Sequence, residues 1–263
     1  MSISRQTSFW RIIFLLITLI TISSCQSNSD TWERIQHTQT LRVGLDPTYP
    51  PFENADSGTL EGLDVDLAEE IGRELNLTIE FVYFGYDGLY DALATQQVDV
   101  LLSALVSDIS KTKDFAFSDP YFNAGQYLVA HQETAAAQTI TEMADLANQT
   151  VAVEIGSEGH VQAIAWERRV PNLTIITLPT ADDALWLVLQ QEADVALVDQ
   201  VSGRLYIQQF PTLTLIPEPV TVEPYVLVTR IADETLLQKL DGALEALEED
   251  GRLETIQAAW LDS

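Results

Sequence analysis

The chain has very little cysteine and histidine. Cys25 is the only cysteine among 263 residues, so the protein can form no internal disulfide and no metal site built from several cysteines. The three histidines, His37, His131 and His160, are far apart in the sequence and do not have the spacing of a metal centre. There is also no phosphate-binding glycine loop, no nucleophile elbow and no zinc-protease helix. No metal or cofactor is therefore expected.

Positive charge is scarce as well. Thirteen lysines and arginines stand against forty aspartates and glutamates, which gives a formal net charge of −27. A surface of this sign repels nucleic acid and anionic lipid headgroups, so neither is expected as a partner. Most of these acids need no role beyond keeping the protein soluble.

Residues 1–24 have the pattern of a secretory signal peptide. Arg5 and Arg11 flank a short apolar run at 12–22, which is too short to span a membrane comfortably. The Ile-Ser-Ser-Cys that follows resembles a bacterial lipoprotein signal, which implies cleavage before Cys25 and a lipid on that cysteine. An ordinary signal peptide or an uncleaved anchor is the alternative. We expect a lipid-anchored protein in the periplasm or on the outer face of the cytoplasmic membrane, with residues 25–39 as a polar tether.

After residue 40, strand-like and helix-like segments alternate. Strands are predicted at 41–45, 78–84, 98–105, 150–155, 173–178 and 193–198, and helices at 63–77, 87–97, 161–169 and 182–191. This alternation predicts an α/β protein with two mainly parallel sheets. Two further helices are expected near the end of the chain, at 233–250 and 252–261, separated at Gly251.

Two segments of the chain resemble each other. Residues 87–100 and 182–195 both open with an acid that could cap a helix, continue with an apolar helical stripe, and end in a Gln and an Asp-Val pair. The matched residues are Gln96 and Gln191, Asp99 and Asp194, and Val100 and Val195. We interpret the two segments as corresponding parts of two similar lobes.

Two extended segments, 121–130 and 217–230, are suited to crossing between these lobes. The predicted division is lobe 1 from 40–123 and 225–263, and lobe 2 from 124–224. Ligands of open parallel sheets bind at the carboxyl ends of the strands. Loops follow such ends at 44–53, 103–108, 154–159 and 198–202, so all four could converge on one cleft between the lobes.

Six motifs in order carry a family resemblance. They are LRVGLDPTYPPFE, EGLDVDLAEEI, DGLYDAL, VDVLLSA, FSDPYF and DGRLETIQAAW. Together they resemble the bacterial extracellular solute-binding proteins of family 3, which deliver polar amino acids to ABC importers. The resemblance implies a two-lobed fold of the periplasmic-binding-protein type (type II) with a two-strand hinge. It also implies a monomer that closes on a small amino acid, catalyses no reaction and has a membrane permease as partner.

The resemblance assigns the ligand's ammonium and carboxylate groups to particular residues. Asp199 matches the aspartate that holds the ammonium, although its spacing also suits a helix N-cap. Ser103 matches a position that offers a hydroxyl or carbonyl to the same ammonium, or it is a plain turn serine. Lys111 stands where most relatives have an arginine for the carboxylate, and a solvated loop lysine is the alternative. Ser157, in the 156–159 segment, belongs to a second candidate anion site made of backbone N–H groups at a helix start.

A further group of residues would surround the ligand's side chain. Tyr49 and Tyr86 match positions that sandwich it, and Asp46 matches an acid that holds a cationic side chain in relatives taking basic amino acids, unless its Asp-Pro pair is merely a turn signal. Glu154 and Glu158 would add negative charge from lobe 2. Four acids against one lysine favour a basic amino acid. Phe52 is expected in the core, and Asp64 as the N-cap of its helix.

Two other functions share this fold. One is a dehydratase acting on prephenate-like acids, for which Glu154 or Glu158 could serve as the proton donor. Such polyanionic substrates would require arginines in the cleft, but no arginine lies between Arg73 and Arg168. The other is a sensing module that presents its bound state to a separate receptor.

Overall fold

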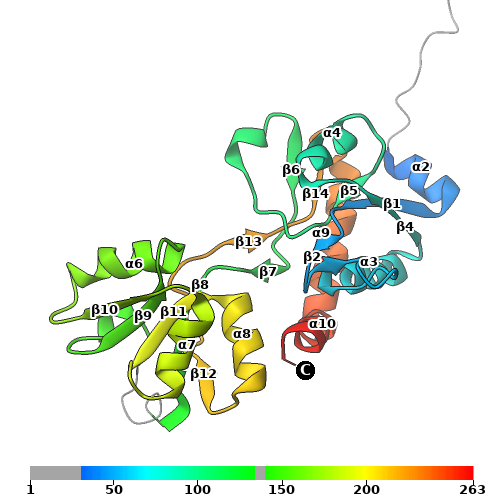
Figure 1. The fold of residues 1–263 in the computed structure, drawn as a ribbon. Coiled ribbons are helices and arrows are strands. Elements are labelled where there is room, and N and C mark those ends of the chain that lie inside the picture. The colour runs from blue at the N-terminus through cyan, green and yellow to red at the C-terminus, as the bar shows by residue number, and fades with distance from the viewer. Residues whose placement is uncertain (1–30, 134–139, 263) are drawn as a thin grey trace, which may run out of the picture.

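The computed structural model describes residues 31–133 and 140–262, which form two α/β lobes joined by two extended segments (Figure 1). Each lobe contains a five-stranded sheet in which three neighbouring strands are parallel and two more pair antiparallel at one side. The predicted two-lobed α/β fold is confirmed. Both sheets are mixed and not purely parallel, because each also contains antiparallel strands that lie next to the crossing segments.

Lobe 1 is built on the sheet β4-β1-β5-β14-β6. Helices α2, α3, α9 and α10 enclose one core cluster against this sheet, and α4 contributes to another. Gly251, with φ at +79°, separates α9 from α10 as the sequence predicts. The elements are β1 (Thr40–Leu45), β4 (Thr78–Tyr83), β5 (Val100–Leu101), β6 (Phe115–Phe117), β14 (Val228–Arg230), α2 (Thr31–Thr38), α3 (Leu63–Leu75), α4 (Leu89–Ala94), α9 (Glu234–Glu249) and α10 (Arg252–Leu261).

Helix α2 corrects the prediction of a polar tether over residues 25–39. Its residues pack on lobe 1: Ile35 is fully buried and Trp32 is partly buried against the same core. The Thr31 hydroxyl donates to Asp233 Oδ1 at 2.6 Å, and Arg34 pairs with Asp99. Residues 31–38 are therefore part of lobe 1 and not of a tether. The predicted signal peptide and Cys25 lie outside the described residues.

Lobe 2 has the sheet β10-β9-β11-β8-β12. Helix α6 packs in one core cluster, and helices α7 and α8 pack in another. The elements are β8 (Gln126–His131), β9 (Thr150–Glu154), β10 (Thr174–Leu178), β11 (Val195–Asp199), β12 (Leu213–Leu215), α6 (Glu158–Glu167), α7 (Ala181–Leu189) and α8 (Gln200–Gln209), with a short 3-10 turn η3 (Met143–Asp145).

The internal similarity corresponds to the same local structure in both lobes. Gln96 and Gln191 both adopt left-handed backbone conformations, with φ of 61° and 60°, just after α4 and α7. Asp99 accepts a hydrogen bond from the backbone N–H of Arg42 on β1, and Asp194 accepts the equivalent bond from Thr150 on β9. Each aspartate thus ties the start of one strand to its parallel neighbour.

The predicted helix-capping role of the opening acids is wrong. Asp182 lies within the first turn of α7, whose N-cap is Thr180. Asp87 lies in the 3-10 turn η1 (Tyr86–Gly88), and α4 has no side-chain cap.

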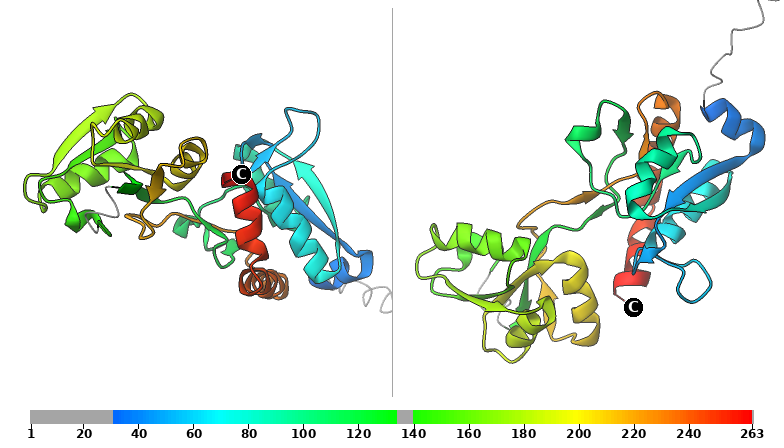
Figure 2. Two further views of the ribbon diagram at one scale, coloured as in Figure 1. Left: turned by 90° about the horizontal axis from the view of Figure 1, so that it is seen from below. Right: turned by 45° about the horizontal axis from the view of Figure 1, so that its top comes forward.

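The two crossings run side by side between the lobes (Figure 2). Their strands β7 (Phe122–Asn123) and β13 (Pro224–Tyr225) pair antiparallel. Asn123 Oδ1 fastens them by accepting from the backbone N–H groups of Gly125 and Glu223, at 3.1 and 2.7 Å. A Cβ at Gly125 would lie 1.9 Å from the carbonyl oxygen of Thr221, so only glycine allows this close approach.

A second contact between the lobes involves α8 and α10. Arg204 on α8 donates from Nε to Asp262 Oδ1 at 2.8 Å, and a second bond joins its Nη2 to the other carboxylate oxygen. Val201 and Leu205 of α8 pack against the lobe 1 core. Within the described ranges, no helix has the length and apolar character needed to cross a bilayer.

Candidate functional site

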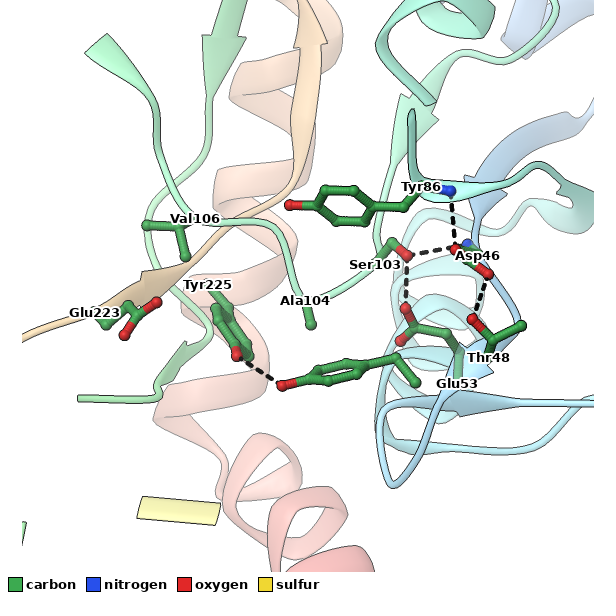
Figure 3. Close-up of a pocket in the computed structure, with 10 residues that line it drawn as sticks. Asp46, Thr48, Glu53, Tyr86, Ser103, Ala104, Val106, Glu223 and Tyr225 are labelled. Carbon is green, nitrogen blue, oxygen red and sulfur yellow. Dashed lines mark hydrogen bonds between the residues drawn. The ribbon is translucent and has the colours of Figure 1, made fainter. Parts of the chain in front are cut away.

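A cavity of about 400 Å³ lies in lobe 1, where β1 and β5 end and β13 enters from the hinge (Figure 3). Three carboxylic acids and three tyrosines line it, and among the described residues no lysine, arginine or histidine does. The lining residues are Asp46, Thr48, Tyr49, Glu53, Tyr86, Ser103, Ala104, Val106, Glu223 and Tyr225. Four of the nine ligand-binding residues predicted from the sequence, namely Asp46, Tyr49, Tyr86 and Ser103, are thus brought together.

The proline-rich segment after β1 carries one wall of this cavity. Its short strands β2 (Thr48–Tyr49) and β3 (Glu53–Asn54) pair antiparallel and flank Phe52, which is fully buried as predicted. The Tyr49 ring stacks on Phe52 with centroids 5.7 Å apart, and its hydroxyl lies 3.5 Å from that of Tyr225. Tyr49 is therefore held from behind by the core while 48% of its surface stays exposed.

Asp46 organises the opposite wall. Its Oδ2 accepts from the backbone N–H of Tyr86 at 2.8 Å, and its Oδ1 accepts from the Thr48 hydroxyl at 2.8 Å. Its own backbone N–H donates to Ser103 Oγ at 3.0 Å. Tyr86 is 60% exposed, and its side chain extends over the cavity in Figure 3. Asp46 thus positions an aromatic ring while presenting negative charge beside it.

Glu53 and Asp64 form a buried acid pair beneath the cavity. Glu53 is 1% exposed and Asp64 is fully buried. The Ser103 hydroxyl donates to Glu53 Oε1 at 2.6 Å, while Asp64 Oδ2 accepts from the Ala104 N–H at 2.8 Å and the Tyr121 hydroxyl at 3.0 Å. The prediction that Asp64 caps its helix is wrong: the N-cap of α3 is Gly62, and the carboxylate turns inward to these donors.

Burial dominates the electrostatics of this pair. It raises the pKa of Glu53 far above its ordinary value, and the charge of Asp64 adds to the effect while the Ser103 hydrogen bond opposes it. Burial also raises the pKa of Asp64, although the bonds from Ala104 and Tyr121 partly offset the shift. Two adjacent buried carboxyl groups cannot both ionise without a compensating cation.

Lys111 does not line this cavity. It ends the 3-10 turn η2 (Ile109–Lys111), and its Nζ lies 4.4 Å from the centroid of the Tyr90 ring. Lys111 and Tyr90 line a neighbouring cavity of about 630 Å³, which shares Tyr86 and Val106 with the first. The lysine is therefore adjacent to the site and not part of its lining.

The predicted lobe 2 residues lie along the carboxyl edge of that lobe's sheet. Glu154 ends β9 and is half-buried. Ser157 is the N-cap of α6: its hydroxyl accepts from the His160 N–H at 3.1 Å and donates to the Glu154 carbonyl at 2.8 Å. Glu158 begins α6 and accepts from Gln162 at 2.7 Å. None of these three lines the lobe 1 cavity.

Asp199 ends β11 and is the N-cap of α8, with Oδ1 accepting from the Ser202 N–H at 2.8 Å. The capping alternative is thus observed. Burial raises the pKa of Tyr225 well above its ordinary value, as do the Tyr49 hydroxyl and the nearby charges of Glu223 and Asp199. Asp199 is therefore close enough to the lobe 1 cavity for its charge to act on a tyrosine of the lining.

Sequence reasoning missed several lining residues, among them Glu53, Glu223 and Tyr225. Glu53 directly follows the core residue Phe52 and begins β3. Glu223 and Tyr225 lie on the second crossing, which was identified as a connection between lobes and not as a source of side chains. Among the described residues, no cluster of histidine, aspartate, glutamate or cysteine could hold a metal ion.

Comparisons with known proteins identify the family. The family model described as "Bacterial extracellular solute-binding proteins, family 3" matches residues 41–263. A probable amino-acid ABC transporter-binding protein of Haemophilus influenzae is 26% identical over 94% of each chain. The arginine-binding extracellular protein ArtP of Bacillus subtilis is 25% identical over 84% of this chain and 85% of the relative.

Solved structures show the same architecture. An ancestral cationic amino acid solute-binding protein is 30% identical, with a TM-score of 0.64 over 88% of this chain and 99% of the other. The L-cystine solute receptor of Neisseria gonorrhoeae in its unliganded open conformation has a TM-score of 0.77 over 89% of this chain and 97% of the other. At 23% identity, that second likeness concerns the fold alone.

Proposed function

The chain belongs to family 3 of the bacterial extracellular solute-binding proteins, and from this premise we propose that it captures a basic amino acid for an ABC importer. The observation that carries the proposal is the composition of the lobe 1 cavity: carboxylic acids and tyrosine rings, with no cationic side chain from the described part of the chain in its lining. Carboxylate charge and aromatic faces together attract ammonium and guanidinium groups. The arginine-binding and cationic amino acid-binding relatives point to the same class of ligand.

The ligand's side chain would lie between Tyr49 and Tyr86, with its cation facing Asp46 and Glu53. Asp199 would hold the α-ammonium from lobe 2 through the oxygen that does not cap α8. The backbone N–H groups at the start of α6 and the Lys111 ammonium would receive the α-carboxylate. A few charge-assisted bonds of about 1.5–3 kcal/mol each are sufficient for micromolar affinity, which corresponds to about −8 kcal/mol.

Binding would proceed by hinge closure. Lobe 1 and the second crossing line the cavity, and Glu154, Ser157, Glu158 and Asp199 lie on the lobe 2 edge without lining it. Rotation about β7 and β13 would bring the two halves of the site together, and the ligand would stabilise the closed form by contacting both lobes. The closed monomer would then dock on a membrane permease, with Cys25 as its lipid anchor.

A thermal-shift screen over the common amino acids tests this function. A ligand present at one hundred times its Kd stabilises the protein by about 2.7 kcal/mol. For a chain of this size, that corresponds to a rise in Tm of about 5–11 °C. Arginine, lysine or another basic amino acid should give this rise, and acidic amino acids should give none. A flat screen, or a response confined to acidic compounds, would refute the proposal.

Two tyrosine variants localise the site. Tyr86→Ala should weaken binding about tenfold or more by removing one aromatic face. Tyr83→Ala is the matched control, because Tyr83 is also an exposed lobe 1 tyrosine, at 53%, but does not line the cavity. Equal losses in both variants would show that the cavity is not the site. Incubation with each ligand, prephenate included, separates capture from turnover. If every ligand is recovered unchanged, the protein binds its ligand and does not convert it.

A further inference from the structure

The acid pair Glu53–Asp64 has more hydrogen-bonding capacity than its surroundings satisfy. Glu53 Oε2 and Asp64 Oδ1 are buried and have no hydrogen-bond partner, although the two carboxyl groups are close enough to share a hydrogen bond. Ser103, Ala104 and Tyr121 supply donors to the remaining two oxygens. A buried polar atom without a partner destabilises the folded protein, and more so when it is charged. A proton between the two carboxyl groups would satisfy both oxygens at once.

No cation compensates this pair. In the part of the chain that the structure describes, the ion pairs of arginine side chains go to other acids, and no lysine forms an ion pair. The titratable groups that face the pair from the packed elements are acids and phenols: Asp46 after β1, Tyr121 before β7, and Tyr49 and Tyr225 from the cavity lining. Asp46 is the charged group among them, and its negative charge makes ionisation of Glu53 harder.

Glu53 also borders the cavity directly, while Asp64 stands behind it and is not part of the lining. A positively charged ligand group arriving at Glu53 would be desolvated together with it, and charges interact most strongly where water is excluded. Such a cation supplies the compensating charge that the free protein lacks.

We propose that the Glu53–Asp64 pair holds one proton in the free protein and releases it when a cationic amino acid binds. The O–H bond of the carboxyl group breaks, its electron pair stays on the carboxylate, and the proton passes to the solvent. The ligand's ammonium or guanidinium takes over the charge balance. A ligand with an uncharged side chain would leave the proton in place, so the same cavity floor would be neutral towards uncharged ligands and an anion towards cationic ones.

This inference rests on the proposed function, and proton counting tests it. Binding of arginine to the full chain is measured by titration calorimetry at about pH 7.5 in two buffers of different ionisation enthalpy. Citrulline, the uncharged counterpart of arginine, is the comparison. We expect about one proton released per arginine, none per citrulline, and an arginine affinity that rises with pH by up to about tenfold per unit.

Two variants show which carboxyl group is responsible. Glu53→Gln should abolish proton release and lower the arginine affinity about 10- to 100-fold, while citrulline binding changes much less. Glu223→Gln removes an exposed carboxylate from the same lining. It should lower the arginine affinity without changing the number of protons released.

A measurement without ligand keeps the inference testable on its own. Glu53 has a folded pKa above its unfolded value, so its contribution to stability is complete below the unfolded pKa and is lost as pH rises towards the folded pKa. The free energy of unfolding should therefore fall between about pH 5 and pH 8, and the fall should be smaller in Glu53→Gln.

The outcomes separate the two proposals. Arginine binding without proton release would overturn the inference and leave the proposed function intact. Failure of every amino acid to bind would overturn both. Identical pH dependence of stability in the wild type and Glu53→Gln would show that the pair holds no extra proton in the free protein.

Discussion

Asp99 offers a direct test of how lobe 1 is held together away from its cavity. Its side chain is fully buried at the start of β5. Its carboxylate accepts from the backbone N–H, Nε and Nη2 of Arg42 at 3.0, 3.2 and 2.7 Å, and it pairs with Arg34 of α2 at 2.5 Å. One group thus joins β5, β1 and the N-terminal helix. Asp99→Asn keeps the size of the side chain and removes its charge.

The expected loss of stability is about 2 kcal/mol. Charge-assisted hydrogen bonds contribute about 1.5–3 kcal/mol each, and three guanidinium contacts weaken in the variant. The full sum does not apply, because the two arginines are 33% and 27% exposed and water resolvates them. The asparagine oxygen also continues to accept from the backbone of Arg42. For a chain of this size, 2 kcal/mol corresponds to a fall in Tm of about 4–8 °C.

The sign of the pH dependence follows from the pKa of Asp99. Burial opposes its ionisation, but the hydrogen bonds from Arg42 and the charge of Arg34 outweigh burial and hold the pKa below its ordinary value. A depressed folded pKa stabilises the protein above the unfolded pKa, and this stabilisation is lost as pH falls through the folded pKa. The difference between wild type and Asp99→Asn should therefore shrink below about pH 4.

Urea denaturation followed by circular dichroism, at neutral pH and at about pH 3.5, measures both effects. Asp56→Asn is the control, because Asp56 is exposed in a loop and its change should stay within about 0.5 kcal/mol. A destabilisation of equal size at both pH values would refute the argument, since it would then arise from packing and not from the charge.

Three other substitutions follow from the structure. Phe52→Ala should lower the free energy of unfolding by about 3–5 kcal/mol. Ligand affinity should also fall, because Tyr49 loses its stacking partner. A loss of stability under about 1 kcal/mol would contradict the packing role of Phe52. Gly125→Ala should lower both the Tm and the ligand affinity, because the alanine Cβ would meet the Thr221 carbonyl and separate the crossing strands. A wild-type Tm and a wild-type affinity would show that the hinge tolerates this separation. Arg204→Gln removes an ion pair that joins the lobes in the open form. Because the open form loses this stabilisation, ligand affinity should rise about two- to fivefold. An unchanged affinity would mean that the ion pair persists on closure.

The repeating elements of the fold could be predicted from the sequence because they depend on local pattern. Hydrophobic period and turn residues located the main strands and helices of both lobes. The matched positions Gln96 and Gln191 even share a left-handed conformation, which is a local requirement at the end of a helix. Such features need no knowledge of which segments meet in space.

Features that depend on distant contacts were missed. Helix α2 has only eight residues and one fully buried side chain, Ile35, so its stability comes from docking on lobe 1 and its sequence looks like a tether. Asp64 has the spacing of an N-cap, but its donors include Tyr121, which lies 57 residues further along the chain. Tyr225 enters the cavity from the second crossing, and no short motif marks it.

Counting acids in the sequence also overstates the negative charge that the cavity presents. Asp46 already accepts hydrogen bonds from Tyr86 and Thr48, which neutralise part of its field. Burial favours the neutral form of Glu53, the acid at the cavity floor. The empty cavity is therefore less negative than its composition suggests, which lowers the cost of keeping several acids together. The selectivity for a cation would come from how readily Glu53 ionises when a cation arrives. That property cannot be deduced from the number of acids in the sequence.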